Sequence, residues 1–482
     1  MILNSFFFLC VIPLVVFLYG VVMWVSSGGR ASGVVSAVFL TVLSYAFFLS
    51  EQPLGALFLF YVTLVTYVFG RVFDSGRVPG EGTAGRRSLL LAAVVLMAVA
   101  PLLIFKYYNF LMESFESLLG AFGAAWRHER VSFVVPLGIS FFTFQALGYL
   151  LEVYRGETRA ERNFLYYVLF VGFFPQIASG PISKAGELLP QIKARRVFST
   201  ADLSEGARLM LWGYFLKAVV ADRLASFVDP VYANYADFSG LTCFLASVFY
   251  SLQIYGDFAG YSLIAIGVGR LFGFRLINNF ERPYFAHSVT DFWRRWHISL
   301  TRWLRENIYF PLGGNRRGKV RTYGNIVATF TVSGVWHGAN LTFIVWGFIH
   351  GIVQCIERFF GLGARPANRL VVALRIALTF LIVNFAWIFF RMPSLGDAWG
   401  VVRRILTLAP GASLTLNNTT AAFIAFALVS LVTTEAVMEY APRAAMLRNR
   451  RLWVRFLTFA ALVFVILTMG VLDSGQFIYV NF

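Results

Sequence analysis

Long apolar runs constrain this chain more than any other feature of its sequence. Of its 482 residues, 58% are hydrophobic and 52 are Phe, and the mean hydropathy is +0.70. A soluble domain builds its core from far less apolar material. The composition therefore predicts an all-α, polytopic integral membrane protein, because helices satisfy their backbone hydrogen bonds within the bilayer. No stretch between the runs is long enough for a separate soluble domain, so a single domain over residues 1–482 is expected.

The lengths of the runs set the expected number of crossings. Residues 1–25 lack a basic start and a small-x-small cleavage site, which favours a retained span over a signal peptide. With about 20 residues per span, roughly ten to twelve transmembrane helices are expected. Two segments are interrupted by Pro, Gly or charge and are expected to be re-entrant or interfacial helices: residues 131–151 and 291–312. The remaining runs are residues 34–49, 54–70, 89–105, 164–177, 209–221, 241–253, 327–360, 370–390, 421–437 and 456–471.

The positive charge of the chain lies mostly between these runs. Lys and Arg number 41 against 24 acidic residues, a net charge of +17. Cations in short loops favour the cytoplasmic face and anionic lipid headgroups, so membrane lipids rather than nucleic acid are the expected partners. The basic loops at residues 28–30, 71–87 and 443–455 are predicted to be cytoplasmic. Both termini would then lie outside, after an even number of crossings.

The cysteines give no sign of a metal centre. Cys10, Cys243 and Cys355 have no paired spacing and sit among apolar residues. Neither a disulfide framework nor a metal site is expected.

A basic, Trp-rich segment carries the first histidine of interest. Treated as one helix, residues 291–306 place Phe292, Trp293, Trp296, Leu300, Trp303 and Leu304 on one side and Asp291, Arg294, Arg295, Arg302 and Arg305 on the other. His297 lies roughly 80° from the centre of the apolar stripe, at its border with the polar face. Periodicity alone favours an interfacial helix with a solvated histidine.

His337 lies within the apolar run at residues 327–360, long enough for two spans. An ionisable side chain in such a run is costly and is a functional candidate. A neutral imidazole can accept a proton from a hydroxyl and return it to a leaving group. The flanking Gly334 and Gly338 are typical of close helix packing, and they would also leave room for a thioester. His350 would lie on the far side of a continuous helix, where a structural hydrogen-bonding role is expected.

Two motifs around these histidines resemble those of a known family. Trp296-His-Ile-Ser-Leu300 and Gly334-Val-Trp-His-Gly-Ala339 are similar to the membrane-bound O-acyltransferase family, most closely to its bacterial polysaccharide-acetylating branch, which includes alginate-acetylating members. Residues 136–156, 174–181, 257–262 and 476–482 extend the resemblance. Leu263 stands where the alginate type commonly has an acid, as in the D-alanyl-transferring relatives. Asp257 in the third block would be functional or form an ion pair with Arg270 or Arg275.

The resemblance implies a mechanism. Helices would surround a central tunnel, with residues 281–360 as the catalytic core, His337 as the catalytic base and His297 assisting. No cofactor would be bound. The acyl donor would be cytoplasmic acetyl-CoA, and Arg294, Arg295 and Arg302 are charged suitably for its phosphates.

The resemblance also implies a place in the cell. The acetyl group would pass to an extracytoplasmic acetyltransferase partner and then to a polysaccharide, at a bacterial inner (plasma) membrane. Two alternatives remain: D-alanyl transfer to teichoic acid, and a non-catalytic transporter of an acyl group or lipid-linked sugar. A transporter would be expected to show internal repeats, and the sequence has no evident repeat.

Overall fold

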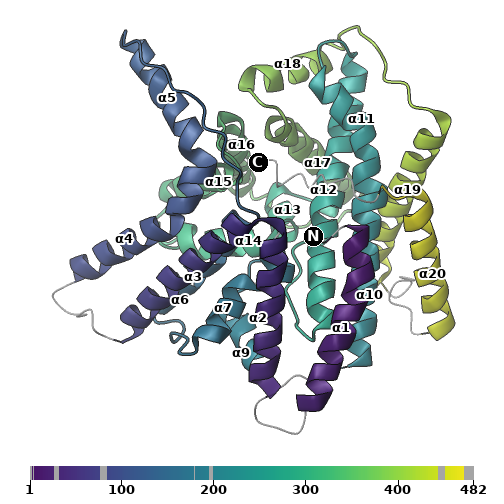
Figure 1. Ribbon diagram of the computed structural model, residues 1–482. Helices are drawn as coiled ribbons and strands as arrows, with labels where there is room; N and C mark the ends of the chain where they lie inside the picture. Colours follow the sequence, from purple (N-terminus) through teal and green to yellow (C-terminus); the bar gives the residue numbers. More distant parts are fainter. Residues whose placement is uncertain are drawn as a thin grey trace. The chain divides into compact units, whose positions relative to one another are not determined.

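The computed structural model describes residues 3, 5–26, 32–75, 84–177, 180–194, 199–442 and 451–471, and the elements that it defines there are all helices (Figure 1). Outside the described residues lie the basic loop at residues 28–30, residues 76–83 of the loop at 71–87, residues 443–450 of the loop at 443–455, and the tail at 476–482. The chain divides into two compact units, which are described separately.

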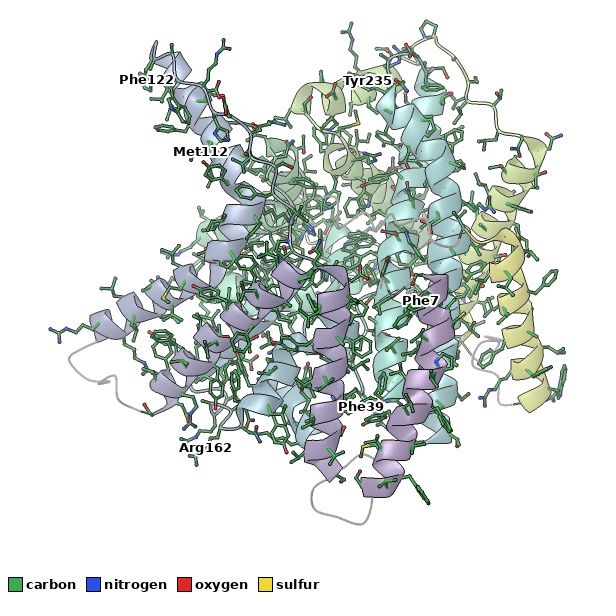
Figure 2. The ribbon with its side chains drawn as sticks, viewed as in Figure 1. Phe7, Phe39, Met112, Phe122, Arg162 and Tyr235 are labelled. Carbon is green, nitrogen blue, oxygen red and sulfur yellow. The ribbon has the colours of Figure 1, made fainter. Side chains whose placement is uncertain are left out.

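The first unit comprises residues 7–202 and 269–276. Its helices are α1 (Phe6–Ser26), α2 (Ser32–Glu51), α3 (Pro53–Asp74), α4 (Ala84–Leu102), η1 (Leu103–Tyr107), α5 (Tyr108–Ala121), α6 (Ile139–Tyr154), α7 (Phe164–Gly172), α8 (Phe174–Ile177) and α9 (Ala185–Lys193). α3 packs along α6 (Figure 1), and Gly70 permits the approach because a Cβ there would meet the Tyr149 ring at 3.0 Å. α5 buries none of its side chains, and Phe122 at its end is 81% exposed (Figure 2).

The second unit comprises residues 3–6, 203–268 and 277–482. Its helices are α10 (Thr200–Tyr214), η2 (Phe215–Ala221), α11 (Asp222–Ala233), α12 (Gly240–Leu271), η3 (Pro283–Phe285), α13 (Val289–Arg295), α14 (Ile298–Leu304), η4 (Arg305–Tyr309), α15 (Lys319–His337), α16 (Leu341–Phe359), α17 (Arg369–Arg391), α18 (Leu395–Leu406), α19 (Asn418–Tyr440) and α20 (Leu452–Met469). Tyr235 lies just after α11 (Figure 2). Its hydroxyl donates a hydrogen bond of 3.2 Å to Asp397 in α18.

Asp257 in the middle of α12 forms an ion pair, although not with the predicted partners. The Lys217 ammonium lies 2.6 Å from Asp257 and 2.7 Å from Asp222, and Lys217 and Asp257 are each 1% exposed. Arg270 instead pairs with Asp202 at 2.9 Å. The ion-pair interpretation is therefore confirmed and the choice of arginine was wrong. Lys217 lies 40 positions earlier, and helix packing alone brings it to Asp257.

Six helices among the described residues are long and apolar enough to cross a membrane: Phe7–Ser26, Ser32–Glu51, Pro53–Asp74, Gly85–Ala121, Arg369–Arg391 and Asn418–Tyr440. Two shorter apolar helices cover Phe164–Ile177 and Trp453–Met469. The expected ten to twelve crossings thus stay a prediction. Residues 289–295 and 298–304 form two helices of seven residues each, about 10 Å long at 1.5 Å per residue, and η4 follows the second. Neither helix is long enough for a span, and the prediction that residues 291–312 do not cross stays a prediction.

The run at residues 327–360 folds back on itself as a helical hairpin. α15 ends at His337, and α16 begins after Asn340, whose side-chain oxygen accepts a hydrogen bond of 2.9 Å from the Thr342 amide. The two helices are in close contact: a Cβ at Gly334 would lie 2.2 Å from the Phe343 carbonyl oxygen. At Gly338 the corresponding space is filled by the Phe343 ring, 2.1 Å away. Both glycines therefore serve helix packing, and neither leaves room for a thioester.

Candidate functional site

His297 does not lie within a helix, as the sequence predicted, but between two helices. α13 ends at Arg295, Trp296 is extended, and His297 has φ 43° and ψ 54°, in the left-handed region. This conformation costs a residue with a Cβ about 1–2 kcal/mol, so the surrounding structure must hold it in place. Asn279 does so from a neighbouring segment. Its carbonyl oxygen accepts from the Ile298 amide at 3.0 Å, and its side-chain oxygen accepts from the Ser299 amide at 3.1 Å.

The break between the two helices turns the His297 side chain into the protein interior. A continuous helix would have left this side chain at the solvated border of the apolar stripe. Its exposure is 0%, so the expectation of a solvated histidine was wrong. The imidazole lies between the ring of Phe258, at 4.7 Å, and that of Trp336, at 5.8 Å. Burial lowers the pKa of His297 to about 3, because a charged imidazole loses its hydration there. His297 is therefore neutral at physiological pH.

His337 is the last residue of α15 and is 2% exposed. Its ring centroid lies 4.8 Å from that of Trp336, 5.0 Å from Trp346 and 5.2 Å from Phe390. Trp336 thus contacts both His297 and His337. The two histidines, 40 residues apart in sequence, flank one buried indole ring.

His350 lies in the same aromatic cluster, which differs from the expectation of a separate face. That expectation assumed one continuous helix, whereas the segment forms a hairpin. The ring centroid of Trp346 lies 5.0 Å from that of His350 and 5.0 Å from that of His337. The Trp293 indole donates a hydrogen bond of 3.2 Å to Nδ1 of His350. The expected structural hydrogen bond is present, and it joins α13 to α16.

A cavity of about 240 Å³ lies beside this cluster, between α13, α14, α15 and α16. Three arginines line it: Arg294, Arg305 and Arg358. Ser333, one helical turn before His337, also lines the cavity; it is fully buried, and its hydroxyl has no hydrogen-bond partner among the described residues. The cavity therefore offers three guanidinium groups and one buried hydroxyl, and the hydroxyl is one turn along α15 from His337. Neither His297 nor His337 is among the residues that line the cavity.

The three arginines predicted from the sequence have different surroundings. Arg294 lines the cavity, as its predicted role requires. Arg295 is held by Asp291 at 3.2 Å and Glu439 at 3.0 Å, and Arg302 is not part of the lining. Sequence reasoning missed Arg305, Arg358, Ser333 and Gln354 as lining residues; Ser333 could have been found from its four-residue spacing to His337.

The part of the chain that the structure describes holds no group of three or more His, Cys, Asp or Glu side chains that could bind a metal ion. The chemistry that this site offers is proton transfer by imidazole and binding of anions by guanidinium groups.

Comparisons with known proteins cover the part of the chain that contains this site. The sequence model of the membrane-bound O-acyltransferase (MBOAT) family matches residues 157–395, a range that contains both histidines and the three cavity arginines. The chain is 38% identical over 360 residues to the probable alginate O-acetylase AlgI of Pseudomonas aeruginosa, which covers 75% of this chain and 68% of the relative.

The names of two other relatives refer to different acceptor molecules. The peptidoglycan O-acetyltransferase of Helicobacter pylori is 35% identical over 351 residues, 67% of this chain and 65% of the relative. The teichoic acid D-alanyltransferase of Bacillus subtilis is 28% identical over 277 residues, 55% of this chain and 69% of the relative. The extent of these matches and the family model lead to one conclusion: the chain belongs to the membrane-bound O-acyltransferase family.

Proposed function

We propose that this enzyme transfers an acetyl group from a cytoplasmic thioester, acetyl-CoA, to a hydroxyl that leads to O-acetylation of an extracytoplasmic polysaccharide. The observation that carries the proposal is the pair of buried histidines on either side of Trp336, next to a cavity lined by three arginines. The names of the relatives support acetyl as the cargo and a bacterial glycan as the final acceptor. The site would work in the inner (plasma) membrane, and an extracytoplasmic acetyltransferase would carry the acetyl group onward.

In the proposed reaction, His337 is the general base. The acceptor hydroxyl attacks the thioester carbonyl, and the imidazole takes its proton. When the tetrahedral intermediate collapses, the protonated imidazole returns that proton to the departing thiolate, so that an ester and a free thiol are formed. The rings of Trp336, Trp346 and Phe390 bound the imidazole of His337 and limit its orientation. In its neutral form an imidazole can accept the hydroxyl proton.

The donor's phosphates would bind to Arg294, Arg305 and Arg358. Guanidinium groups form paired, charge-assisted hydrogen bonds with phosphate oxygens, and these three converge from three helices on one cavity. Arg295 has a different role, because Asp291 and Glu439 already neutralise it. The proposal thus keeps Arg294 from the sequence prediction and adds Arg305 and Arg358.

Substitution of His337 tests the proposal. His337→Ala removes the proton acceptor and should lower acetyl transfer by about 10²–10⁴-fold. Loss of a buried polar group from an apolar cluster should leave membrane accumulation unchanged. The measurements are polymer-bound acetyl in cells and release of free CoA by the purified variant offered acetyl-CoA and acceptor.

His128→Ala is the matched control, because His128 lies far along the chain, in a loop where its ring contacts Asn109 at 3.1 Å. It should retain full activity. Normal accumulation of His337→Ala with intact acetylation would disprove the assignment of the base.

D-alanyl transfer to teichoic acid is the second candidate, favoured by the similarity to the Bacillus subtilis enzyme. The two cargoes are separated by offering the purified enzyme a radiolabelled acetyl thioester or a D-alanyl thioester in parallel. Acetyl transfer alone supports the proposal, and D-alanyl transfer alone replaces it.

A further inference from the structure

A second, larger hollow lies along α17, apart from the residues that line the site cavity. Its volume is about 1150 Å³, above the range of roughly 300–1,000 Å³ typical of pockets for small molecules. One face of α17 forms its floor, with Val372, Ala373, Ile376, Ala377, Phe380 and Leu381. Ala373 and Ala377, one turn apart, contribute the smallest side chains of this floor.

The two ends of this groove differ in charge. Arg365 and Arg369 line the end at the start of α17, and both side chains are exposed. Neither forms an ion pair with any acidic residue that the structure describes. Arg375 donates hydrogen bonds of 3.1 Å to the Leu362 and Ala364 carbonyl oxygens, which holds the loop carrying Arg365 against the helix. The groove is thus apolar along its length and cationic at one end.

The flanking helices place this groove at a membrane surface. α17 is long and apolar enough to span a bilayer, and so is α19, which ends at Tyr440 on the groove wall. α17 starts at the two arginines, and α19 ends shortly before the basic segment 443–455. The charged end therefore lies at a headgroup level and the apolar length lies beside acyl chains. Basic pockets between membrane helices are suited to anionic lipid headgroups.

We propose that this groove binds an anionic phospholipid, with its phosphate on Arg365 and Arg369 and an acyl chain along Ala373 and Ala377. A zwitterionic lipid would satisfy the apolar length equally well, so the two arginines without acidic partners select the anionic headgroup. This inference is independent of the proposed acetyl transfer.

One aromatic side chain, Tyr284, would separate the bound lipid from the aromatic residues next to the His297 loop. The ring centroid of Tyr284, on the groove wall, lies 5.3 Å from that of Phe380. It also lies 6.1 Å from the ring centroid of Phe292 and 6.3 Å from that of Trp296. Trp296 directly precedes His297. An acyl chain in the groove would therefore support the aromatic rings from which the His297 loop extends.

Lipid-dependent stability of the purified full chain tests this site. In detergent, added phosphatidylglycerol should raise the Tm of the unaltered protein by at least about 3 °C, and phosphatidylcholine should raise it much less. The double variant Arg365→Gln/Arg369→Gln removes exposed charges only, so it should fold and should lose the difference between the two lipids. Native mass spectrometry should show bound phosphatidylglycerol on the unaltered protein and its loss from the double variant.

A matched pair of substitutions tests the apolar part. Ala377→Trp fills the groove and should abolish retention of phosphatidylglycerol, whereas Leu378→Trp, at a neighbouring position that is 58% exposed and outside the lining, should retain it. If Ala377→Trp does not fold, the arginine double variant decides the question. Equal stabilisation by both lipids, or phosphatidylglycerol retained by the arginine double variant, would overturn the proposal.

Discussion

His297 shows how one backbone conformation can decide the role of a side chain. Its left-handed φ of 43° lies between two short helices, and the residue is fully buried against Phe258 and Trp336. Asparagine is among the few residues other than glycine that adopt this conformation readily, whereas most residues with a Cβ are strained there. The position therefore favours a residue with a short polar side chain.

We expect His297→Asn to retain measurable activity, above that of His337→Ala. Asparagine supports the left-handed backbone and keeps a hydrogen-bonding group of similar reach. Water cannot take the place of the imidazole, because the site is buried, so His297→Ala should lose more activity than His297→Asn. Initial rates of acetyl transfer for the three variants give the comparison. Equal loss in His297→Asn and His337→Ala would mean that both imidazoles are required as one unit.

At the scale of the elements, the α15–α16 hairpin holds His337 in place through backbone contact. Gly334 and Gly347 each lie where a Cβ would come within 2.2 Å of a carbonyl oxygen on the partner helix. Since backbone atoms cannot move aside as a flexible side chain can, the hairpin requires glycine at both positions. His337 ends α15 only one turn beyond Gly334.

Gly334→Ala should therefore destabilise the protein and lower its activity, by forcing α15 away from α16. Gly324→Ala is the matched control on the same helix, because no atom lies within 4 Å of a Cβ there. That control should be neutral or stabilising by about 0.5–1 kcal/mol, as alanine favours the helix. Thermal unfolding in detergent measures both. Similar Tm values for the two variants would contradict the packing role.

Two segments that precede His297 in the chain are joined through α19. Glu439 accepts from Arg282 at 2.6 Å and from Arg295 at 3.0 Å, and the Arg295 carbonyl accepts from the Glu281 amide at 2.9 Å. Arg282, like His297, has a positive φ, of 49°. A single carboxylate on α19 thus holds the segment that carries Asn279 and also the end of α13, which leads into the His297 loop.

Glu439→Gln should weaken this attachment by about 1.5–3 kcal/mol, the value of hydrogen bonds to charged groups. Acetyl transfer should fall because the His297 loop loses its fixed position. Asp229→Asn provides the comparison. It breaks a different ion pair, the one of 3.1 Å between Asp229 and Arg391 at the end of α17. Tm and activity are measured for both. If Asp229→Asn lowers activity as much as Glu439→Gln, the effect is general destabilisation.

At the scale of the whole molecule, family membership makes the chain a multi-pass membrane enzyme that transfers acyl groups. The prediction of an acyltransferase is confirmed, and the alternative of a non-catalytic transporter was wrong. The orientation in the membrane stays a prediction from the loop charges, since most residues of the basic loops lie outside those that the structure describes.

Cysteine labelling tests the orientation. In a variant without the three native cysteines, Gly85→Cys should react only from the cytoplasmic side, because it adjoins the basic loop at 71–87. Ser413→Cys should react only from outside, since it precedes α19, whose other end leads to the basic segment 443–455. Labelling of Gly85→Cys from outside would reverse the orientation and with it the cytoplasmic donor.

Apolar runs and motif spacing determine much of this protein by themselves. The runs predict helices because a chain in a bilayer must satisfy its backbone internally, and that requirement needs no knowledge of tertiary contacts. The position of His337 in an apolar run predicts its burial, because an ionisable side chain is costly when it faces lipid. Both conclusions depend only on which residues are adjacent along the chain, and that can be read from the sequence alone.

Only the tertiary structure decided how the site is assembled. The helix break at His297 depends on hydrogen bonds from Asn279, and the ion pair of Asp257 depends on Lys217, 40 residues away. Likewise, Arg358 joins Arg294 at the cavity only because α15 and α16 fold back on each other. Helical periodicity treats each segment as if it were alone, whereas these arrangements arise from contacts between segments distant in the chain.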